Sequence, residues 1–294
     1  MPDFKDQSLL VTGASGHFGR IAVEELLARG ATKIVAGTRE PDKLADLRDR
    51  GVEVRRVDFD EAGSLAQAFA GIDRMLMVST DGIGKRIAQQ TAAIDAAKAV
   101  GIKHIIYTSA PAARPNADAR TILQEHFATE LAIAGSGLDF TILRNHMYAE
   151  NNLAGVAQIV ASGQLFGLVG DRGTAYVTRA DAARTAAGAL LLASGKAIED
   201  VTGPAAVTNT ERTALLSKLS GKPVTSIAVT PDELAAGMVA AGLPGDFADV
   251  LVAFQIDAVL GYHGVVTNIV ERYSGRKPHS LANFLEDNRS ALVS

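Results

Sequence analysis

The first half of the chain alternates short apolar runs with helix-length amphipathic segments, and this rhythm restricts the fold more than any other feature. The runs are rich in β-branched residues and lack the polar alternation of a half-exposed strand; they span residues 8–13, 33–39, 52–60, 73–80, 103–110 and 138–145. Continuous apolar strands separated by helices are typical of a parallel sheet covered on both faces. The sequence therefore predicts a doubly wound α/β domain.

The rhythm loosens after about Asn151. A helix, a glycine-rich stretch at residues 163–178, another helix and short strands near residues 200–208 and 224–230 follow. Proteins of this fold class usually place substrate-binding elements there, which is an inference from the fold alone. We expect residues 1–150 to form the cofactor-binding domain. Residues 151–294 should form a smaller substrate-binding α/β region, packed on that domain and partly interleaved with it.

Composition excludes several classes of function. The 294 residues carry a formal net charge of −4 and no Lys/Arg-rich run, which argues against a nucleic-acid partner. There is no cysteine, so disulfides, thiolate metal sites and cysteine nucleophiles are excluded. The polar start lacks the pattern of a secretory signal, and no segment has the roughly 20 apolar residues that span a bilayer. We expect a cytoplasmic monomer or homodimer with no membrane partner.

Three glycines, Gly13, Gly16 and Gly19, end the first predicted strand and begin the first predicted helix. In this context glycines let the backbone approach a pyrophosphate, and the helix N-terminus supplies N–H groups and a favourable dipole. The sequence therefore predicts a Rossmann domain that binds a dinucleotide. Its first cofactor-binding residues are Gly13, Ser15, Gly16, His17, Phe18 and Gly19.

The end of the second predicted strand indicates which dinucleotide binds. An NAD enzyme places an acidic residue there to hold the ribose 2′-hydroxyl, whereas this chain has Arg39, with Lys43 one helical turn further on. A guanidinium matches a 2′-phosphate with two hydrogen bonds. The sequence favours NADPH, with NADH as a weaker cofactor. The alternative is a solvated Arg39 beside Glu40.

The chain resembles the NmrA-like group of atypical short-chain dehydrogenase/reductases, and within it the bacterial NAD(P)H:quinone oxidoreductases, triphenylmethane reductases and azoreductases. The likeness extends over the whole chain and is carried, in order, by "VTGASGHFG", "GTREPDKL", "VDFD", "YTSA", "LRNHMYAENNL" and "TRADAA". The resemblance implies that Asp58 and Phe59 lie near the adenine. It also implies cofactor contacts at Ser79, Thr80, Thr108, Ser109, His126, Asn145, Tyr148 and Asn151.

The proton relay of the larger family is missing. Members that oxidise alcohols use a Tyr whose pKa is lowered by a Lys four residues later on the same helix. One such spacing exists, Tyr273 to Lys277, but Gly275 interrupts the segment and no parallel strand precedes it. Counting back from the sixth predicted strand, as the family spacing implies, places Ile122 at the Tyr position and His126 at the Lys position. An acidic residue, Glu130, is retained, and Ala110 replaces the usual Ser.

Loss of the relay restricts the substrate. Hydride addition to an isolated carbonyl produces a strongly basic alkoxide that needs a proton donor. Addition to a quinone gives a delocalised aryloxide, and addition to a cationic dye neutralises charge, so orientation and one hydrogen bond suffice. His126, Asn145 and Tyr148 are the candidate catalytic residues, with His126 preferred over His146 as donor. The alternative for His126 is a half-buried helix residue beside Glu125.

These observations favour an NADPH-dependent reductase that passes hydride directly to a quinone or to an electron-poor azo or triarylmethane compound. Speculative pocket residues for this small aromatic substrate are Tyr148, Phe166 and Tyr176. No flavin or metal is implied, because metal-ligand spacings, G-x-S-x-G and a complete phosphate-binding loop are absent from the sequence. Two alternatives stay open: a redox sensor that binds NADP(H) and a protein partner without turnover, and a reductase of plant phenolic substrates.

Overall fold

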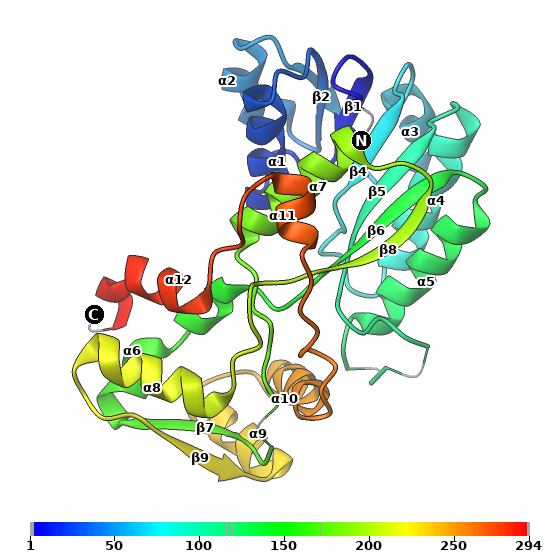
Figure 1. The fold of residues 1–294 in the computed structure, drawn as a ribbon. Helices are drawn as coiled ribbons and strands as arrows, with labels where there is room; N and C mark the ends of the chain where they lie inside the picture. The colour runs from blue at the N-terminus through cyan, green and yellow to red at the C-terminus, as the bar shows by residue number, and fades with distance from the viewer. Residues whose placement is uncertain (1–2, 116, 119, 171, 293–294) are drawn as a thin grey trace.

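The computed structural model describes residues 3–115, 117–118, 120–170 and 172–292. Its centre is a parallel sheet of seven strands in the order β3-β2-β1-β4-β5-β6-β8 (Figure 1). The strands are β1 (Ser8–Val11), β2 (Lys33–Thr38), β3 (Glu53–Arg56), β4 (Arg74–Met77), β5 (His104–Ser109), β6 (Asp139–Asn145) and β8 (Lys196–Val201). The Rossmann-type fold and the six strands expected from the sequence are confirmed.

Helices cover both faces of this sheet because successive side chains of each buried strand point to opposite sides. Leu9 and Ile106 lie in one hydrophobic core, whereas their neighbours Leu10 and Tyr107 lie in the other. The first core is covered by α1 (His17–Ala28), η1 (Pro41–Leu44), α2 (Ala45–Arg48), α7 (Arg179–Leu192) and α11 (Ile269–Ser274). The second is covered by α3 (Ala62–Ala68), α4 (Arg86–Ala99) and α5 (Leu123–Gly135).

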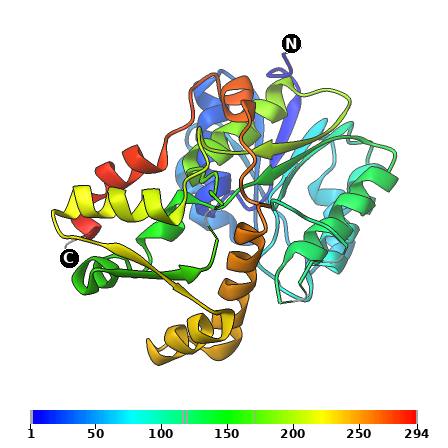
Figure 2. The same cartoon turned by 60° about the horizontal axis from the view of Figure 1, so that its bottom comes forward.

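A smaller region extends from one end of the sheet (Figures 1 and 2). It is built around the parallel pair β7 (Gln164–Leu168) and β9 (Thr225–Val229). It has a core of its own that includes Val160, Leu165, Leu216 and Leu285. Its helices are η2 (Ala149–Leu153), α6 (Val156–Ser162), α8 (Asn209–Ser220), α9 (Pro231–Ala240), α10 (Gly245–Val259), α12 (Leu281–Asp287) and η3 (Arg289–Leu292).

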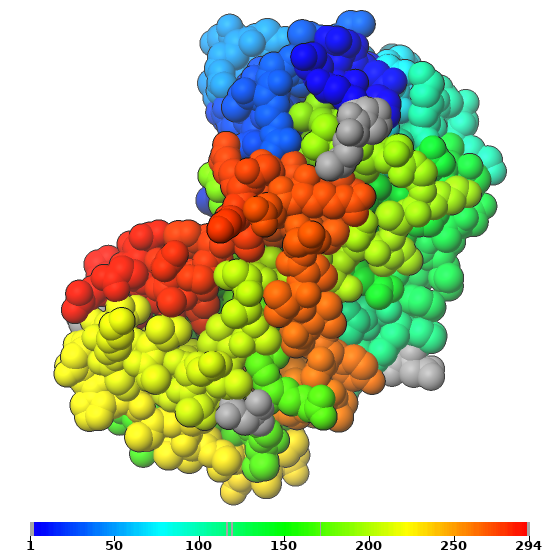
Figure 3. Space-filling model, viewed as in Figure 1, coloured from blue at the N-terminus to red at the C-terminus, as the bar shows by residue number. Residues whose placement is uncertain are grey.

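The two parts are interleaved along the chain. After β7 the chain returns to the sheet, where α7 packs against α1 and β8 pairs with β6 as the seventh strand. The sequence had indicated only a short strand of the smaller region near residue 200. The division at residue 150 stays a proposal: it marks the position along the chain after which elements of the two parts alternate. Figure 3 shows the smaller region, in yellow and red, packed directly on the sheet domain.

Helix α10 connects the smaller region to the loop between β5 and α5. Arg114 of that loop pairs with Asp257 of α10 at 2.6 Å, and its guanidinium stacks on the Tyr262 ring at 4.2 Å. Phe254 of α10 packs on an apolar cluster formed by Ala110, Ala117 and Leu123. Helix α10 therefore stands beside the carboxyl end of β5. No helix within the described ranges combines the length and apolarity that a membrane crossing needs.

Candidate cofactor site

The glycine loop brings bare backbone to the carboxyl edge of the sheet. Gly13 has a φ of +62°, a conformation that other residues rarely adopt. A Cβ atom at Gly19 would lie 2.4 Å from the Gly13 carbonyl oxygen, so the loop and α1 approach too closely for any side chain. Helix α1 begins after Gly16 without a side-chain cap. The exposed N-terminus of α1 therefore has unfilled N–H groups of the kind that hold phosphate.

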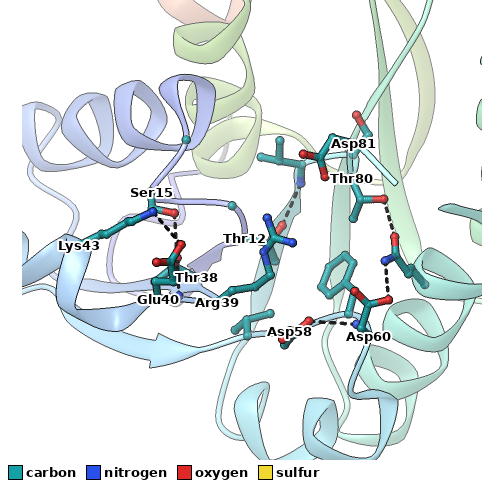
Figure 4. A pocket seen from close by; sticks show the side chains of 17 residues that line it. Thr12, Ser15, Thr38, Arg39, Glu40, Lys43, Asp58, Asp60, Thr80 and Asp81 are labelled. Carbon is teal, nitrogen blue, oxygen red and sulfur yellow. Dashed lines mark hydrogen bonds and ion pairs between the residues drawn. The ribbon is translucent and has the colours of Figure 1, made fainter. Parts of the chain in front are cut away.

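Next to this loop lies a cavity of about 380 Å³ (Figure 4). Nine residues expected from the sequence line it: Gly13, Ser15, Gly16, Arg39, Lys43, Asp58, Phe59, Ser79 and Thr80. Sequence reasoning missed Thr12, Thr38, Glu40, Val57, Asp60, Val78, Asp81 and Gln89. Most of these follow the carboxyl end of a strand, which would have been the signal to find them. Gln89 lies on α4 and gave no such signal.

The two cations at one end of the cavity differ in their availability. Lys43 is bound by Glu40 at 2.7 Å, and both side chains are mostly exposed. Arg39 is also exposed, yet no hydrogen bond or ion pair joins it to any residue that the structure describes. Figure 4 shows Arg39 extending into the cavity, with Lys43 and Glu40 paired to one side. Arg39 is thus the cation with unfilled donors at this end.

Polar contacts order the opposite wall. Asp58 accepts a hydrogen bond from the Asp60 backbone at 3.1 Å and pairs with Arg56 at 3.2 Å. Gln89 links Thr80 to Asp60 through bonds of 2.8 and 2.9 Å. Phe59 is buried beneath the cavity. These bonds hold the ends of β3 and β4 at a fixed separation.

At the end of β5 the two expected residues differ. The Thr108 hydroxyl accepts a hydrogen bond from the Ser79 backbone at 2.8 Å, so it fixes the adjoining loop. Ser109 instead donates to Glu130 at 2.6 Å, and Arg144 binds the same carboxylate with two bonds of 2.6 and 2.9 Å. Glu130, the acidic residue retained on α5, is therefore the anchor of a buried network rather than a free acid.

His126 lies on the buried side of α5 and is not among the residues that line the cavity. Its Nδ1 lies 2.8 Å from the Tyr107 hydroxyl. Burial, and then the positive charge of Arg86, lower the pKa of His126 to about 3, so the imidazole is neutral. Ile122 immediately precedes the helix. No group at the positions of the missing relay can therefore act as a charged acid at neutral pH.

The loop after β6 supplies the remaining candidates. Asn145 is buried and donates to the Tyr148 hydroxyl at 3.3 Å, while its Oδ1 has no partner among the described residues. Tyr148 lies under the Arg179 guanidinium, 5.1 Å from the ring centre, and burial raises its pKa. Asn151 is exposed in the middle of η2. Of the two other speculative pocket residues, Phe166 is exposed on β7 and Tyr176 is half-buried.

The other histidine of this loop belongs to a second polar group. His146 lies 3.1 Å from Asp200 of β8, and its Nδ1 is buried without a partner among the described residues. His263, after α10, is likewise buried with an unpaired Nε2, and burial lowers its pKa to about 4. The sequence gave no signal for His263, because its loop has no motif.

Helix α11 ends at Ser274 with Gly275 in the left-handed conformation, so Lys277 does not lie one turn after Tyr273 on a common helix. Within the part of the chain that the structure describes, no group of three or more His, Asp or Glu side chains is arranged to hold a metal ion.

Comparison with known proteins identifies the family. A family model described as NAD(P)H-binding matches residues 13–191, which include the glycine loop, nearly all of the residues that line the cavity and the loop after β6. The chain belongs to the NAD(P)H-binding family. It is 36% identical over 256 residues to quinone oxidoreductase 2 of Escherichia coli, covering 86% of this chain and 88% of that protein. It is 26% identical over 285 residues to the NAD(P)H azoreductase of Xenophilus azovorans, covering 97% and 99%.

Solved structures agree with these relatives. The Escherichia coli NADPH-dependent quinone oxidoreductase in complex with NADPH superposes with a TM-score of 0.88 at 32% identity, over 97% of this chain and all of that one. The triphenylmethane reductase of Citrobacter sp. with NADP(H) gives 0.85 at 29% identity, over 95% and 99%. This NAD(P)H-binding protein is thus an NAD(P)H-dependent oxidoreductase, and the resemblance found in its sequence is confirmed.

The residues present fit the cofactor of the family. The backbone edge at Gly13 and Gly16 is open and leaves room for a pyrophosphate. Arg39 has unfilled donors where a 2′-phosphate would lie. At the other end, the orphaned Oδ1 of Asn145 is a buried acceptor that suits an amide N–H donor such as the carboxamide of nicotinamide.

Proposed function

We propose that this NAD(P)H-binding oxidoreductase transfers hydride directly from NADPH to a quinone or to an electron-poor azo or triarylmethane compound, without a Tyr-Lys relay. The observation that carries the proposal is the state of His126: a neutral, buried imidazole at the position of the relay lysine, one turn after Ile122 at the position of the tyrosine. The names of the reductase relatives support the same substrate classes.

In this proposal the open cavity holds the adenosine half of the cofactor. Arg39 binds the 2′-phosphate, Asp58 and Phe59 flank the adenine, and the loop at Gly13 to Gly19 holds the pyrophosphate. Lys43 adds positive charge only when Glu40 releases it. NADPH is preferred over NADH because the guanidinium forms charge-assisted bonds with a phosphate that a hydroxyl cannot match.

At the other end, bound NADPH supplies a hydride ion. Asn145 and Tyr148 orient the nicotinamide, and the neutral His126 donates one hydrogen bond to the ribose or to the acceptor oxygen. A quinone becomes a hydroquinone anion of phenol-like basicity, so its protonation by water needs no strong acid from the protein. Proximity and orientation are then the main catalytic contributions.

The experiment is to follow NADPH absorbance with a panel of quinones, azo dyes and triarylmethane dyes, and with an unactivated ketone as control. We expect oxidation of NADPH with at least one member of the panel and none with the ketone. Binding of NADPH without oxidation by any acceptor would contradict the proposal and support the cofactor sensor.

A further inference from the structure

Tyr107 and His126 form a buried pair between β5 and α5. Their rings lie 5.9 Å apart, and the phenol oxygen is 2.8 Å from Nδ1 of the imidazole. Tyr107 is fully buried and His126 is 3% exposed. We propose that Tyr107 is a positioning residue that fixes His126 in one neutral tautomer, with its single proton on Nε2. This inference rests on the role of His126 in the proposed function.

The direction of the hydrogen bond follows from the burial of the phenol. Burial raises the pKa of Tyr107, so its hydroxyl keeps its hydrogen. Nδ1 of His126 is the hydrogen-bond partner of that hydroxyl in the described structure. If Nδ1 donated instead, the hydroxyl hydrogen would have to reach Thr129 or Gln90, the other polar side chains beside the phenol. Neither forms a hydrogen bond with the hydroxyl among the described residues, and the Gln90 side-chain oxygen has no partner at all there, so this hydrogen would be left unmet at a cost. Tyr107 therefore donates, and Nδ1 carries no proton.

A neutral imidazole that accepts at Nδ1 must carry its proton on Nε2. Nε2 lies on the opposite edge of the ring from the tyrosine, and no described residue accepts a hydrogen bond from it. Helix α5 begins beside the loop after β4, because Glu125 accepts from the Gly84 backbone at 2.7 Å. His126 therefore presents a fixed donor near the carboxyl edge of the sheet, where the cofactor is expected.

The charged groups around His126 support the neutral state. Arg86 of α4 acts on the imidazole with positive charge. The two carboxylates of the same helix that could counter it are both occupied. Glu125 binds Arg86 at 3.1 Å, and Glu130 binds Arg144 of β6 and Ser109 of β5. The donor is therefore available across the neutral pH range without titrating.

The first test observes the tautomer directly in the full chain. Nitrogen-15 NMR of labelled histidines distinguishes a protonated from an unprotonated ring nitrogen, and the His126→Gln variant assigns the signals. We expect the proton on Nε2 in the native chain and exchange between both nitrogens in Tyr107→Phe. A proton on Nδ1 in the native chain would overturn the inference. Because this measurement needs no acceptor, it stays decisive if the proposed reaction fails.

The second test is a double-mutant cycle with the best acceptor of the panel. We expect Tyr107→Phe to lower kcat about tenfold, as loss of one positioned hydrogen bond does, with KM for NADPH little changed. The same change in a His126→Gln background should have no further effect, because Tyr107 acts through His126. Equal losses in both backgrounds would assign Tyr107 a structural role only.

A matched control removes another buried phenol. Tyr273 is 2% exposed and packs in the opposite core, against α7. Tyr273→Phe should leave kcat and the His126 signals unchanged. A tenfold loss of kcat in Tyr273→Phe as well would show that removing any buried phenol hydroxyl disturbs the fold. The double-mutant cycle would then no longer support the inference.

Discussion

The two ends of the proposed cofactor site are built in opposite ways. At the adenosine end the side chains are exposed and charged, and Arg39 has no partner among the described residues. At the nicotinamide end His126, Glu130 and Asn145 are buried, and all three are held by hydrogen bonds to neighbouring side chains. The first arrangement selects a ligand by its charge, and substitutions there should leave the stability of the fold unchanged. The second arrangement holds a few buried groups in fixed positions before the cofactor binds, and losing these contacts lowers the stability of the fold itself.

The largest expected effect is a loss of stability in acid, which comes from three buried histidines. Burial lowers the pKa of His104 and His126 to about 3 and that of His263 to about 4. In the unfolded chain these groups titrate near pH 6.5, so below that pH the unfolded state binds more protons and acid favours unfolding. Each contributes up to about 1.4 kcal/mol of unfolding free energy per pH unit.

Urea unfolding at a series of pH values measures the slope of the unfolding free energy against pH. Stability should be greatest above pH 6.5 and should fall continuously as the pH approaches 4. The His126→Gln variant should reduce the slope by about a third. An unfolding free energy that stayed constant across this range would contradict the burial of these imidazoles.

Breaking the buried carboxylate network should have the next largest effect. Glu130→Gln leaves the Arg144 guanidinium without its charged partner, at a cost of about 3 kcal/mol in the free energy of unfolding. Urea denaturation provides the measurement. The matched control is Glu24→Gln on the exposed Glu24–Arg50 pair, which water screens and which should matter little. Similar losses in both variants would remove the contrast between the two regions.

Removing the free cation should change cofactor preference and leave the fold intact. Arg39→Ala should raise KM for NADPH about 30-fold, the equivalent of about 2 kcal/mol for a charge-assisted contact, with KM for NADH little changed. Steady-state kinetics with both cofactors measures the split. The control is Arg48→Ala, which removes the same charge from an exposed position outside the cavity. Retention of the preference for NADPH in Arg39→Ala would refute the phosphate contact.

The smallest effect is expected at the exposed pair beside Arg39. Glu40→Gln removes a negative charge and releases Lys43, so KM for NADPH should fall about twofold. The change should disappear in high salt, because both groups are exposed. A gain that persists in high salt would indicate that Lys43 contacts the phosphate at close range.

Local sequence patterns determined a large part of this molecule. The six apolar strands, the glycine loop and Arg39 could be predicted because each depends on residues close in the sequence. These are a continuous apolar run, a turn that excludes side chains, and the end of a strand that faces the cofactor. The family resemblance placed His126 in register with the missing lysine. The seventh strand β8 was not recognised, because its half-exposed run "KAIEDV" is only paired as a sheet edge once the chain returns from the smaller region.

Only the tertiary structure decided the chemical state of the site. The neutrality of His126 comes from burial against Tyr107, which lies 19 residues earlier on another element, and the anchoring of Glu130 comes from Arg144 on β6. The same holds for His263, which follows α10 along the chain and whose pKa is lowered by burial and by the nearby His146. Protonation and hydrogen bonding depend on solvent exclusion and on distant partners, and no local pattern records either.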